Sequence, residues 1–202
     1  MSFIDSLKKR RSIYALGKNL ADGVKAIETI KEAVRLSPTA FNSQTGRVLI
    51  LTGAAQDKLW DEIIAPELKA AMEAQGAPES AWDSTKAKLA SFKAAFGTAL
   101  FFEDQTVVKE LQEKFALYAE NFPVWSEQGS GIIAVNAWTA LAELGVGANL
   151  QHYNPVIDEA VAKEWNIPTS WKLRSQLVFG SIEAAAGEKT FISDEDRFII
   201  AG

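Results

Sequence analysis

The sequence contains no cysteine and a single histidine, His152, in 202 residues. Without cysteine the chain has no disulfide, no thiolate metal ligand and no cysteine nucleophile. One imidazole cannot build a zinc centre that needs several. Any chemistry must therefore come from other side chains or from a bound organic group.

Long apolar runs and concentrated basic charge are also missing. Nowhere do about 18 apolar residues follow one another, as a membrane-spanning helix requires, and the basic start MSFIDSLKKRRS lacks the apolar segment of a secretion signal. The net charge is −5, with both signs spread along the chain, which argues against nucleic acid as a partner. We therefore expect a cytoplasmic protein that contacts neither membranes nor nucleic acid.

The chain does have enough apolar residues, 48% of the total, for a large core. Helical and strand patterns are mixed, without a repeat or a low-complexity linker, so residues 1–202 are predicted to form one three-layered α+β domain with few strands. Helices are expected up to about residue 10 and at 22–36, 55–75, 79–96, 105–121, 131–144 and 155–165, and strands at 48–51, 98–104 and 173–180. A short extended stretch is expected after Gly147.

The predicted helix at 131–144 is apolar on nearly every face. A helix without a polar side must be buried, within the chain or between subunits. A chain of this length with few strands offers limited cover for it. We therefore expect an obligate dimer.

The first candidate site is the triplet Arg10-Arg11-Ser12, at the end of the opening helix. Guanidinium groups match phosphate oxygens bidentately and a serine hydroxyl adds a hydrogen bond, so the triplet could hold a phosphate monoester. The alternative is a solvated, charged helix end, which is a common feature of protein surfaces.

The second candidate is the loop SPTAFNSQ at 37–44, in which Asn42, Ser43 and Gln44 precede a strand. Their amides and hydroxyl offer donors and acceptors that suit the imide edge or the polyol of a ligand. The alternative is a turn whose side chains satisfy its own backbone.

The third candidate is LGVGANLQHYNP at 144–155. Gly145 and Gly147 suggest a dinucleotide-binding loop, but they end a helix rather than open one, and Leu150 stands where that motif needs a third glycine. We interpret them as a helix C-cap and as a place where backbone can approach a flat ligand. For His152 the alternatives are a role in proton transfer and a packed, hydrogen-bonded position.

Together these stretches resemble the nitroreductase family of flavoproteins over essentially the whole chain. The runs FGTALFFEDQ, NFPVWSEQ, LQHYNP and EWNIPTSWKLRSQLVFG are similar to its fatty-acid-repression-mutant (nitroreductase-like) branch. The resemblance implies a three-layer fold with a mostly antiparallel sheet flanked by helices. It also implies an intertwined homodimer that binds FMN at its interface.

The resemblance assigns most of the candidates to parts of FMN. Residues 10–12 would bind the phosphate and ribityl region, and residues 42–44 would approach the flavin from the partner subunit, with Pro38 and Phe41 as apolar wall. Leu150, Gln151 and His152 would lie along the ring, with a main-chain N–H near His152 on N5.

Three further basic residues and one tyrosine complete the predicted site. Lys189 and Arg197 are candidates for a C-terminal pair that binds the phosphate. Tyr14 stands where many relatives carry Arg or Lys beside the N1–C2=O2 edge of the flavin, a position at which positive charge supports reduced flavin. Lys93 is predicted to supply that charge instead, and its alternative is an exposed helical lysine.

The implied activity is hydride transfer. FMN would take a hydride from NADH or NADPH and pass it through N5 to a nitroaromatic compound or a quinone in a ping-pong reaction, so no side-chain acid is needed for the first half. One alternative is a flavin-binding regulatory or stress-response protein with little turnover. Another is a helical interaction module without a cofactor.

Overall fold

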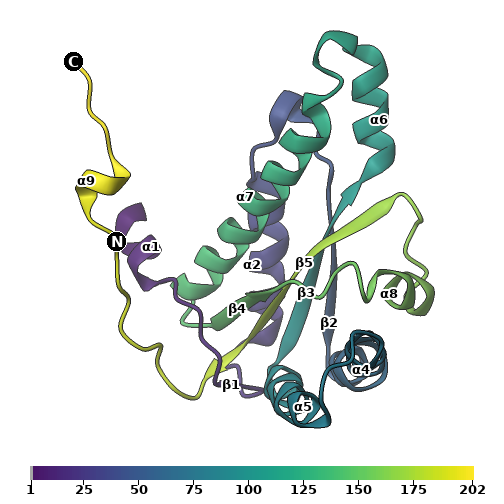
Figure 1. Cartoon of the computed structure of the whole chain (residues 1–202). Coiled ribbons are helices and arrows are strands. Elements are labelled where there is room, and N and C mark those ends of the chain that lie inside the picture. The colour runs from purple at the N-terminus through teal and green to yellow at the C-terminus, as the bar shows by residue number, and fades with distance from the viewer. Residues whose placement is uncertain (1) are drawn as a thin grey trace.

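The computed structural model describes residues 2–202 and has one sheet between two layers of helices (Figure 1). The sheet order is β1 (Leu16–Gly17), β5 (Trp171–Ile182), β3 (Gly97–Asp104) and β2 (Gly46–Thr52), and β4 (Gly147–Gln151) pairs with β5. All of these pairs are antiparallel. The predicted three-layer α+β class is confirmed, and the three predicted strands are present, each longer by up to two residues at either end.

Apart from the short α9, which was not predicted, the helices follow the predicted pattern with one exception. They are α1 (Phe3–Lys9), α2 (Gly23–Leu36), α3 (Ala54–Lys58), the π-helical η2 (Leu59–Ile64), α4 (Ala65–Ala74), α5 (Glu79–Lys93), α6 (Gln105–Lys114), α7 (Asn121–Glu143), α8 (Asp158–Glu164) and α9 (Asp194–Arg197), with 3₁₀ turns η1 (Ala40–Asn42) and η3 (Ala116–Tyr118). In residues 2–202 no helix is both long enough and apolar enough to cross a membrane.

The exception is the boundary predicted at Pro123, which is wrong. The helix expected at 105–121 ends as α6 at Lys114, and Pro123 lies in the first turn of α7. Proline is tolerated there because the first N–H groups of a helix have no intrahelical acceptor to lose. The helix predicted from residue 131 therefore begins ten residues earlier.

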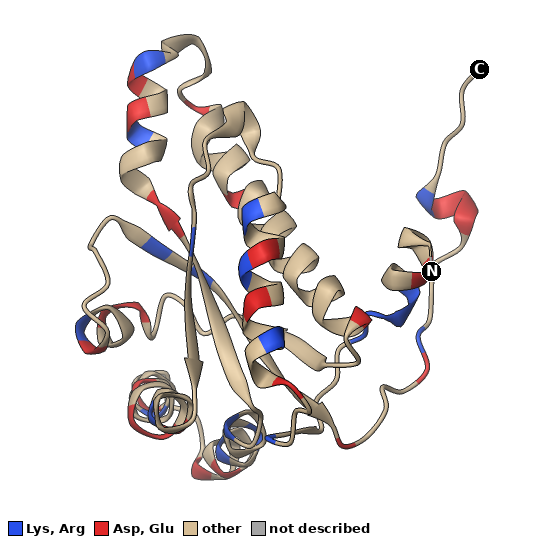
Figure 2. Ribbon diagram, turned by 180° about the vertical axis from the view of Figure 1, so that it is seen from behind, with Lys and Arg blue, Asp and Glu red and all other residues tan. Residues whose placement is uncertain are grey.

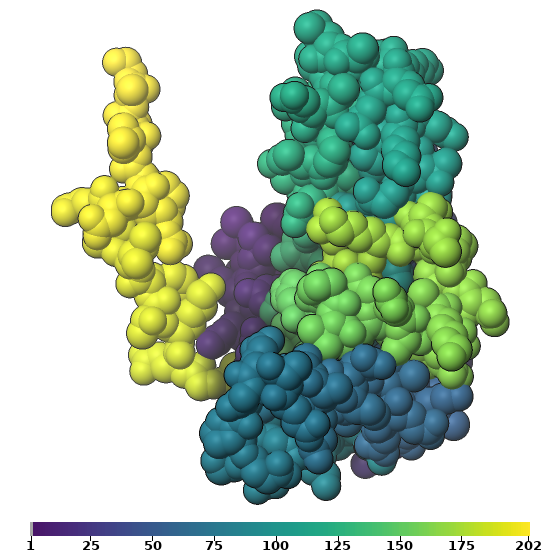
Figure 3. Space-filling view, turned by 45° about the vertical axis from the view of Figure 1, so that its right-hand side comes forward, coloured from purple at the N-terminus to yellow at the C-terminus, as the bar shows by residue number. Residues whose placement is uncertain are grey.

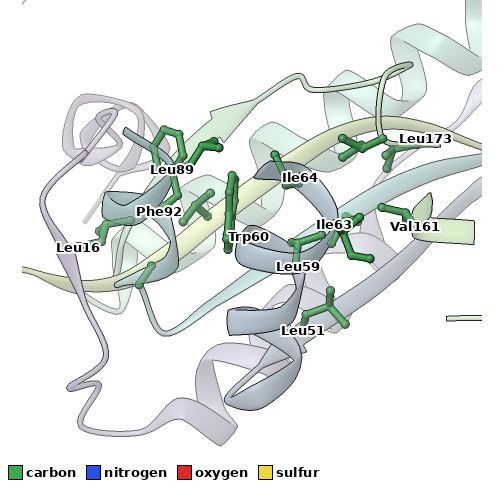
Figure 4. Close-up of a cluster of buried hydrophobic side chains, with 14 of the residues drawn as sticks. Leu16, Leu51, Leu59, Trp60, Ile63, Ile64, Leu89, Phe92, Val161 and Leu173 are labelled. Carbon is green, nitrogen blue, oxygen red and sulfur yellow. The ribbon is translucent and has the colours of Figure 1, made fainter. Parts of the chain in front are cut away.

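One face of the sheet packs against α3, α4, α5 and α8 around Trp60 (Figure 4). Trp60 is 1% exposed, and its ring centroid lies 5.1 Å from that of Phe92. The indole N–H donates to the Thr98 hydroxyl (3.1 Å), which donates to the Gln56 side-chain oxygen (2.7 Å). The polar atoms inside this core are thus paired, as buried groups must be.

The opposite face of the sheet packs against α2 and α7. Leu100 faces the Trp60 core, whereas its neighbours Ala99 and Phe101 face these two helices, as the period of two of a strand requires. On the far side of α7, Ile132 and Val135 are each 39% exposed. The apolar helix is therefore covered on one side and open on the other.

The segment that follows β5 forms an arm that stands away from the sheet (Figures 1 and 3). It carries apolar side chains into solvent: Phe191 is 69% exposed, Ile199 98% and Ile200 95%. Burying one such side chain contributes about 1.5–3 kcal/mol. An apolar arm of this kind gains stability when another surface covers it.

Candidate functional site

A cavity of about 540 Å³ lies where the arm leaves the sheet. Its walls are residues 184–189 of the arm and the segment after α1, which gives it five of the predicted site residues: Arg10, Arg11, Ser12, Tyr14 and Lys189. Figure 2 shows a continuous basic stretch where α1 ends. The volume is within the range of about 300–1,000 Å³ that small-molecule sites occupy.

Two hydrogen bonds hold the segment after α1 against the edge of β4. The Ile13 main-chain N–H donates to the Ala148 carbonyl (2.9 Å), and the buried side-chain amide of Asn149 donates to the Ile13 carbonyl (2.8 Å). Across the cavity, Arg11 Nη2 donates to the carbonyl of Gly187 (2.7 Å). Arg11 therefore joins the two walls.

The two arginines bring positive charge to a cavity that one carboxylate, that of Glu188, also lines. In the described chain neither Arg10 nor Arg11 forms an ion pair. Partial burial, and then the like charge of Arg11, lower the pKa of Arg10 below its usual value, although an arginine still stays protonated at neutral pH. The Arg10 guanidinium lies 4.3 Å from the ring centroid of Trp138, a cation–π contact that orients it. The site can accept an anion.

The third predicted stretch lies along β4, where Ala148 bridges to Ser12 of the cavity wall. The Ala148 carbonyl points to the outer edge of the sheet, where it accepts the Ile13 N–H. Main-chain groups of alternate residues share a direction, so the N–H groups of Leu150 and His152 face the same outer edge. Gln151 is buried, and the Tyr153 N–H is occupied by the side-chain oxygen of Gln176 (2.8 Å). His152 is thus positioned to offer a main-chain donor.

The loop at 37–44 has a strained backbone. Phe41, Asn42 and Gln44 have φ of 58°, 50° and 49°, a region that residues other than glycine seldom adopt and that is enriched at functional sites. The Gln44 N–H donates to the Thr39 hydroxyl (3.0 Å). Within residues 2–202 the side chains of Asn42, Ser43 and Gln44 form no hydrogen bonds, so they do not cap their own turn and are free to bind another group.

This loop and the arginine cavity lie at opposite ends of α7 (Figure 1). Phe41 stacks on Trp125 near the start of α7, with ring centroids 5.9 Å apart. Arg10 lies over Trp138, thirteen residues further along, which is about 20 Å at 1.5 Å per residue. A single chain therefore does not bring the two groups of candidates together.

Two further predicted residues belong neither to the arginine cavity nor to the stretches at 42–44 and 150–152. Lys93, at the end of α5, forms an ion pair with Asp61, and this hydrogen bond raises the pKa of Lys93. Arg197 lies in α9 of the exposed arm. The predicted roles of both side chains toward a flavin stay predictions.

Sequence reasoning missed two features near the predicted site. The first is an aromatic cluster around Phe41, made of Phe115, Tyr118, Phe122 and Trp125. Phe122 and Trp125 are three residues apart, which places them on one face of a helix. The sequence would have indicated this if the predicted helix had begun at residue 121, where α7 begins. The second is a cavity beside His152 that contains Arg174. In the described residues no group of three histidine or acidic side chains is arranged to hold a metal ion.

The sequence profile of the nitroreductase family matches residues 7–181. The chain belongs to the nitroreductase family. Two proteins of Saccharomyces cerevisiae are similar to it, each over 96% of this chain: HBN1 (38% identical, 95% of its length covered) and the nitroreductase FRM2 (36%, 94%). The second takes its name from the fatty acid repression mutant, so the predicted family and branch are both confirmed.

Solved structures show the same fold. Nitroreductase CinD from Lactococcus lactis is 77% identical, with both chains fully covered and a TM-score of 0.92 in its complex with chloramphenicol. It has also been solved with 4-nitrophenol and with nicotinic acid. A protein from Desulfovibrio desulfuricans solved with FMN is 18% identical, with 98% and 96% of the two chains covered and a TM-score of 0.69, and shares the fold.

Proposed function

We propose that this protein is an FMN-dependent oxidoreductase that uses NADH or NADPH to reduce nitroaromatic compounds or quinones. The observation that carries the proposal is the cavity with two unpaired arginines and Ser12, a residue that also bridges to Ala148 at the edge of β4. Guanidinium forks and a hydroxyl suit a phosphate monoester, and the free main-chain donors beyond it suit the edge of a flat ring. Membership of a family with an FMN-bound neighbour supports this assignment.

The residues present fit FMN in their charge and in their sequence from the phosphate end to the ring end of the cofactor. Arg10, Arg11, Ser12 and Lys189 would hold the phosphate, Tyr14 would line the ribityl region, and the edge from Leu150 to His152 would lie along the ring. When bound, FMN would supply hydride transfer from NAD(P)H to the acceptor in a ping-pong reaction. The acceptor class is supported by the small aromatic ligands of CinD. We also propose a cytoplasmic location, with which the lack of cysteine agrees.

Steady-state oxidation of NADH and NADPH by the purified protein, with a quinone or a nitroaromatic compound as acceptor, tests the activity. We expect turnover that depends on both substrates. A protein that binds FMN but gives no turnover with either donor would favour the regulatory alternative.

We further propose that two copies of the chain form the complete site. One chain separates the loop at 42–44 from the arginine cavity by about 20 Å along α7, so a second copy is needed to bring them together. The exposed face of α7 and the apolar arm offer the surface that such a dimer would bury.

We expect the protein to be a dimer at micromolar concentration, because these apolar surfaces are unfavourable in water. Size-exclusion chromatography with light scattering measures this directly. A stable monomer that retains FMN would contradict the proposal.

Replacing His152 by glutamine should have small effects. The side chain is exposed, and the group assigned to the flavin is its main-chain N–H. We expect FMN to be retained, reduction by NADH to be nearly unchanged, and reoxidation by a quinone to slow by no more than about tenfold, whereas general acid catalysis would contribute about 10²–10⁴-fold. Stopped-flow measurement of the two half-reactions from acidic to alkaline pH decides between them.

A further inference from the structure

A second cavity, of about 300 Å³, lies between α7 and the end of β4. Leu150 and His152 line it from the strand, and Arg174 and Ser175 line it from β5. Adjacent residues of a regular strand point to opposite faces of a sheet. Arg174 and Ser175 can share a cavity only because the strand is irregular at this point.

The irregularity is a β-bulge. Phe101 pairs with Ser175, but the next residue, Phe102, pairs with Leu173, so Arg174 is the extra residue of β5. A bulge changes the direction of a side chain and is common beside functional sites. Here it places the guanidinium on the same side of the sheet as α7.

Two carboxylates contact Arg174, and they differ in how firmly they are held. Glu103, 1% exposed, accepts from Nε at 2.8 Å. Glu127 of α7, 65% exposed, lies 3.4 Å from Nη2. A long contact to an exposed carboxylate contributes little. Glu103 therefore fixes the guanidinium, whereas Glu127 can be displaced.

The guanidinium keeps unused donors that face the cavity side. Its hydrogen bonds within residues 2–202 account for two of the five N–H groups of an arginine. A carboxylate that approaches in the plane of the guanidinium could use two of the others in a bidentate pair, which is a stronger arrangement than the single long contact with Glu127.

The surrounding charges set a condition on such a ligand. Lys172 is the other nearby cation, and Asp158 is a third carboxylate. With Glu127 in place the three carboxylates outnumber the two cations, so a further anion is disfavoured. An anionic ligand gains affinity when Glu127 moves away or loses its charge.

We propose that Arg174 is a subsite for the carboxylate of a small aromatic acceptor, and that Glu127 competes with that carboxylate for the guanidinium. The inference rests on the proposed function, because the cavity borders His152, at the edge of β4 assigned to the flavin. An uncharged ring of the same size would gain nothing from Arg174.

Calorimetric titration of benzoate and its neutral analogue benzamide onto the purified holoprotein tests the subsite. Glu127→Gln should tighten benzoate binding about two- to fivefold, the effect of removing one exposed charge contact, and leave benzamide binding unchanged. Arg174→Lys should weaken benzoate binding about tenfold, because lysine cannot form the bidentate pair. Glu110→Gln, on α6 and outside the cavity, is the matched control and should alter neither.

A benzoate affinity that does not change in Glu127→Gln, or a benzamide affinity that changes by the same factor, would overturn the proposal. Glu127 is exposed, so its variant reports on the subsite even if Arg174→Lys folds poorly. FMN content and reduction by NADH, measured on the parent protein, separate the two proposals: the absence of either contradicts the proposed function. Intact reduction together with a benzoate affinity that Glu127→Gln leaves unchanged contradicts only the subsite, and the titration itself needs no turnover.

Discussion

Replacing Arg11 by alanine should weaken FMN binding by about 10- to 150-fold, the loss expected for one charge-assisted contact with a phosphate. Arg11 lines the cavity, has no ion-pair partner in the described residues, and donates to the Gly187 carbonyl on the opposite wall. The variant should remain folded because Arg11 belongs to neither of the two hydrophobic cores. Titration of the apoprotein with FMN, followed by flavin fluorescence, measures the affinity.

The matched control for this variant is Lys8→Ala. It removes the same charge from the same end of α1, but Lys8 does not line the cavity. We expect FMN affinity within about twofold of the parent, since exposed charges away from a ligand contribute little. Equal losses in the two variants would mean that Arg11 acts only through the general positive charge of this region.

Replacing Glu103 by leucine should lower the free energy of unfolding by about 3 kcal/mol, because it leaves the largely buried guanidinium of Arg174 without its firm partner. Glu103 is 1% exposed and lies 2.8 Å from Arg174 Nε, while the Arg174 side chain is 18% exposed. Urea unfolding at one fixed protein concentration measures the change, since association would make the apparent stability depend on concentration.

Glu127→Gln removes the other carboxylate from the same arginine and serves as the control. That carboxylate is 65% exposed, so its loss should change the unfolding free energy by no more than about 0.5 kcal/mol. If the two variants destabilised the protein equally, the distinction between a fixed and a displaceable carboxylate would be wrong.

The apolar patterns predicted the sheet and most helices well. Strands β3 and β5 contain buried apolar runs and β2 is a half-buried one, and their short length and flanking glycines distinguish such runs from helices. The predicted start of α7 was wrong because Pro123 was interpreted as the end of the preceding helix. Proline stops a helix when it lies in the interior, but it fits the first turn of one. That residues 1–202 form a single domain stays a prediction.

Five of the predicted site residues line one cavity, but the spatial arrangement of the full set could not be predicted from the sequence. Motif residues 10–12 and 189 meet in one cavity although they come from opposite ends of the chain. No pattern in the sequence showed that the loop at 42–44 lies about 20 Å from that cavity. The bulge at Arg174 was equally hidden, because one extra residue in a strand leaves no mark on composition or on an apolar run.

The proposed function is tested most directly by anaerobic titration of the purified protein with NADH, followed by its visible absorbance. We predict the absorbance bands of bound oxidised flavin, their loss on addition of stoichiometric NADH or NADPH, and their return when a quinone or nitroaromatic compound is added. A protein that is colourless and takes up no added FMN would contradict the proposal. Flavin bands that neither NADH nor NADPH diminishes would contradict it as well.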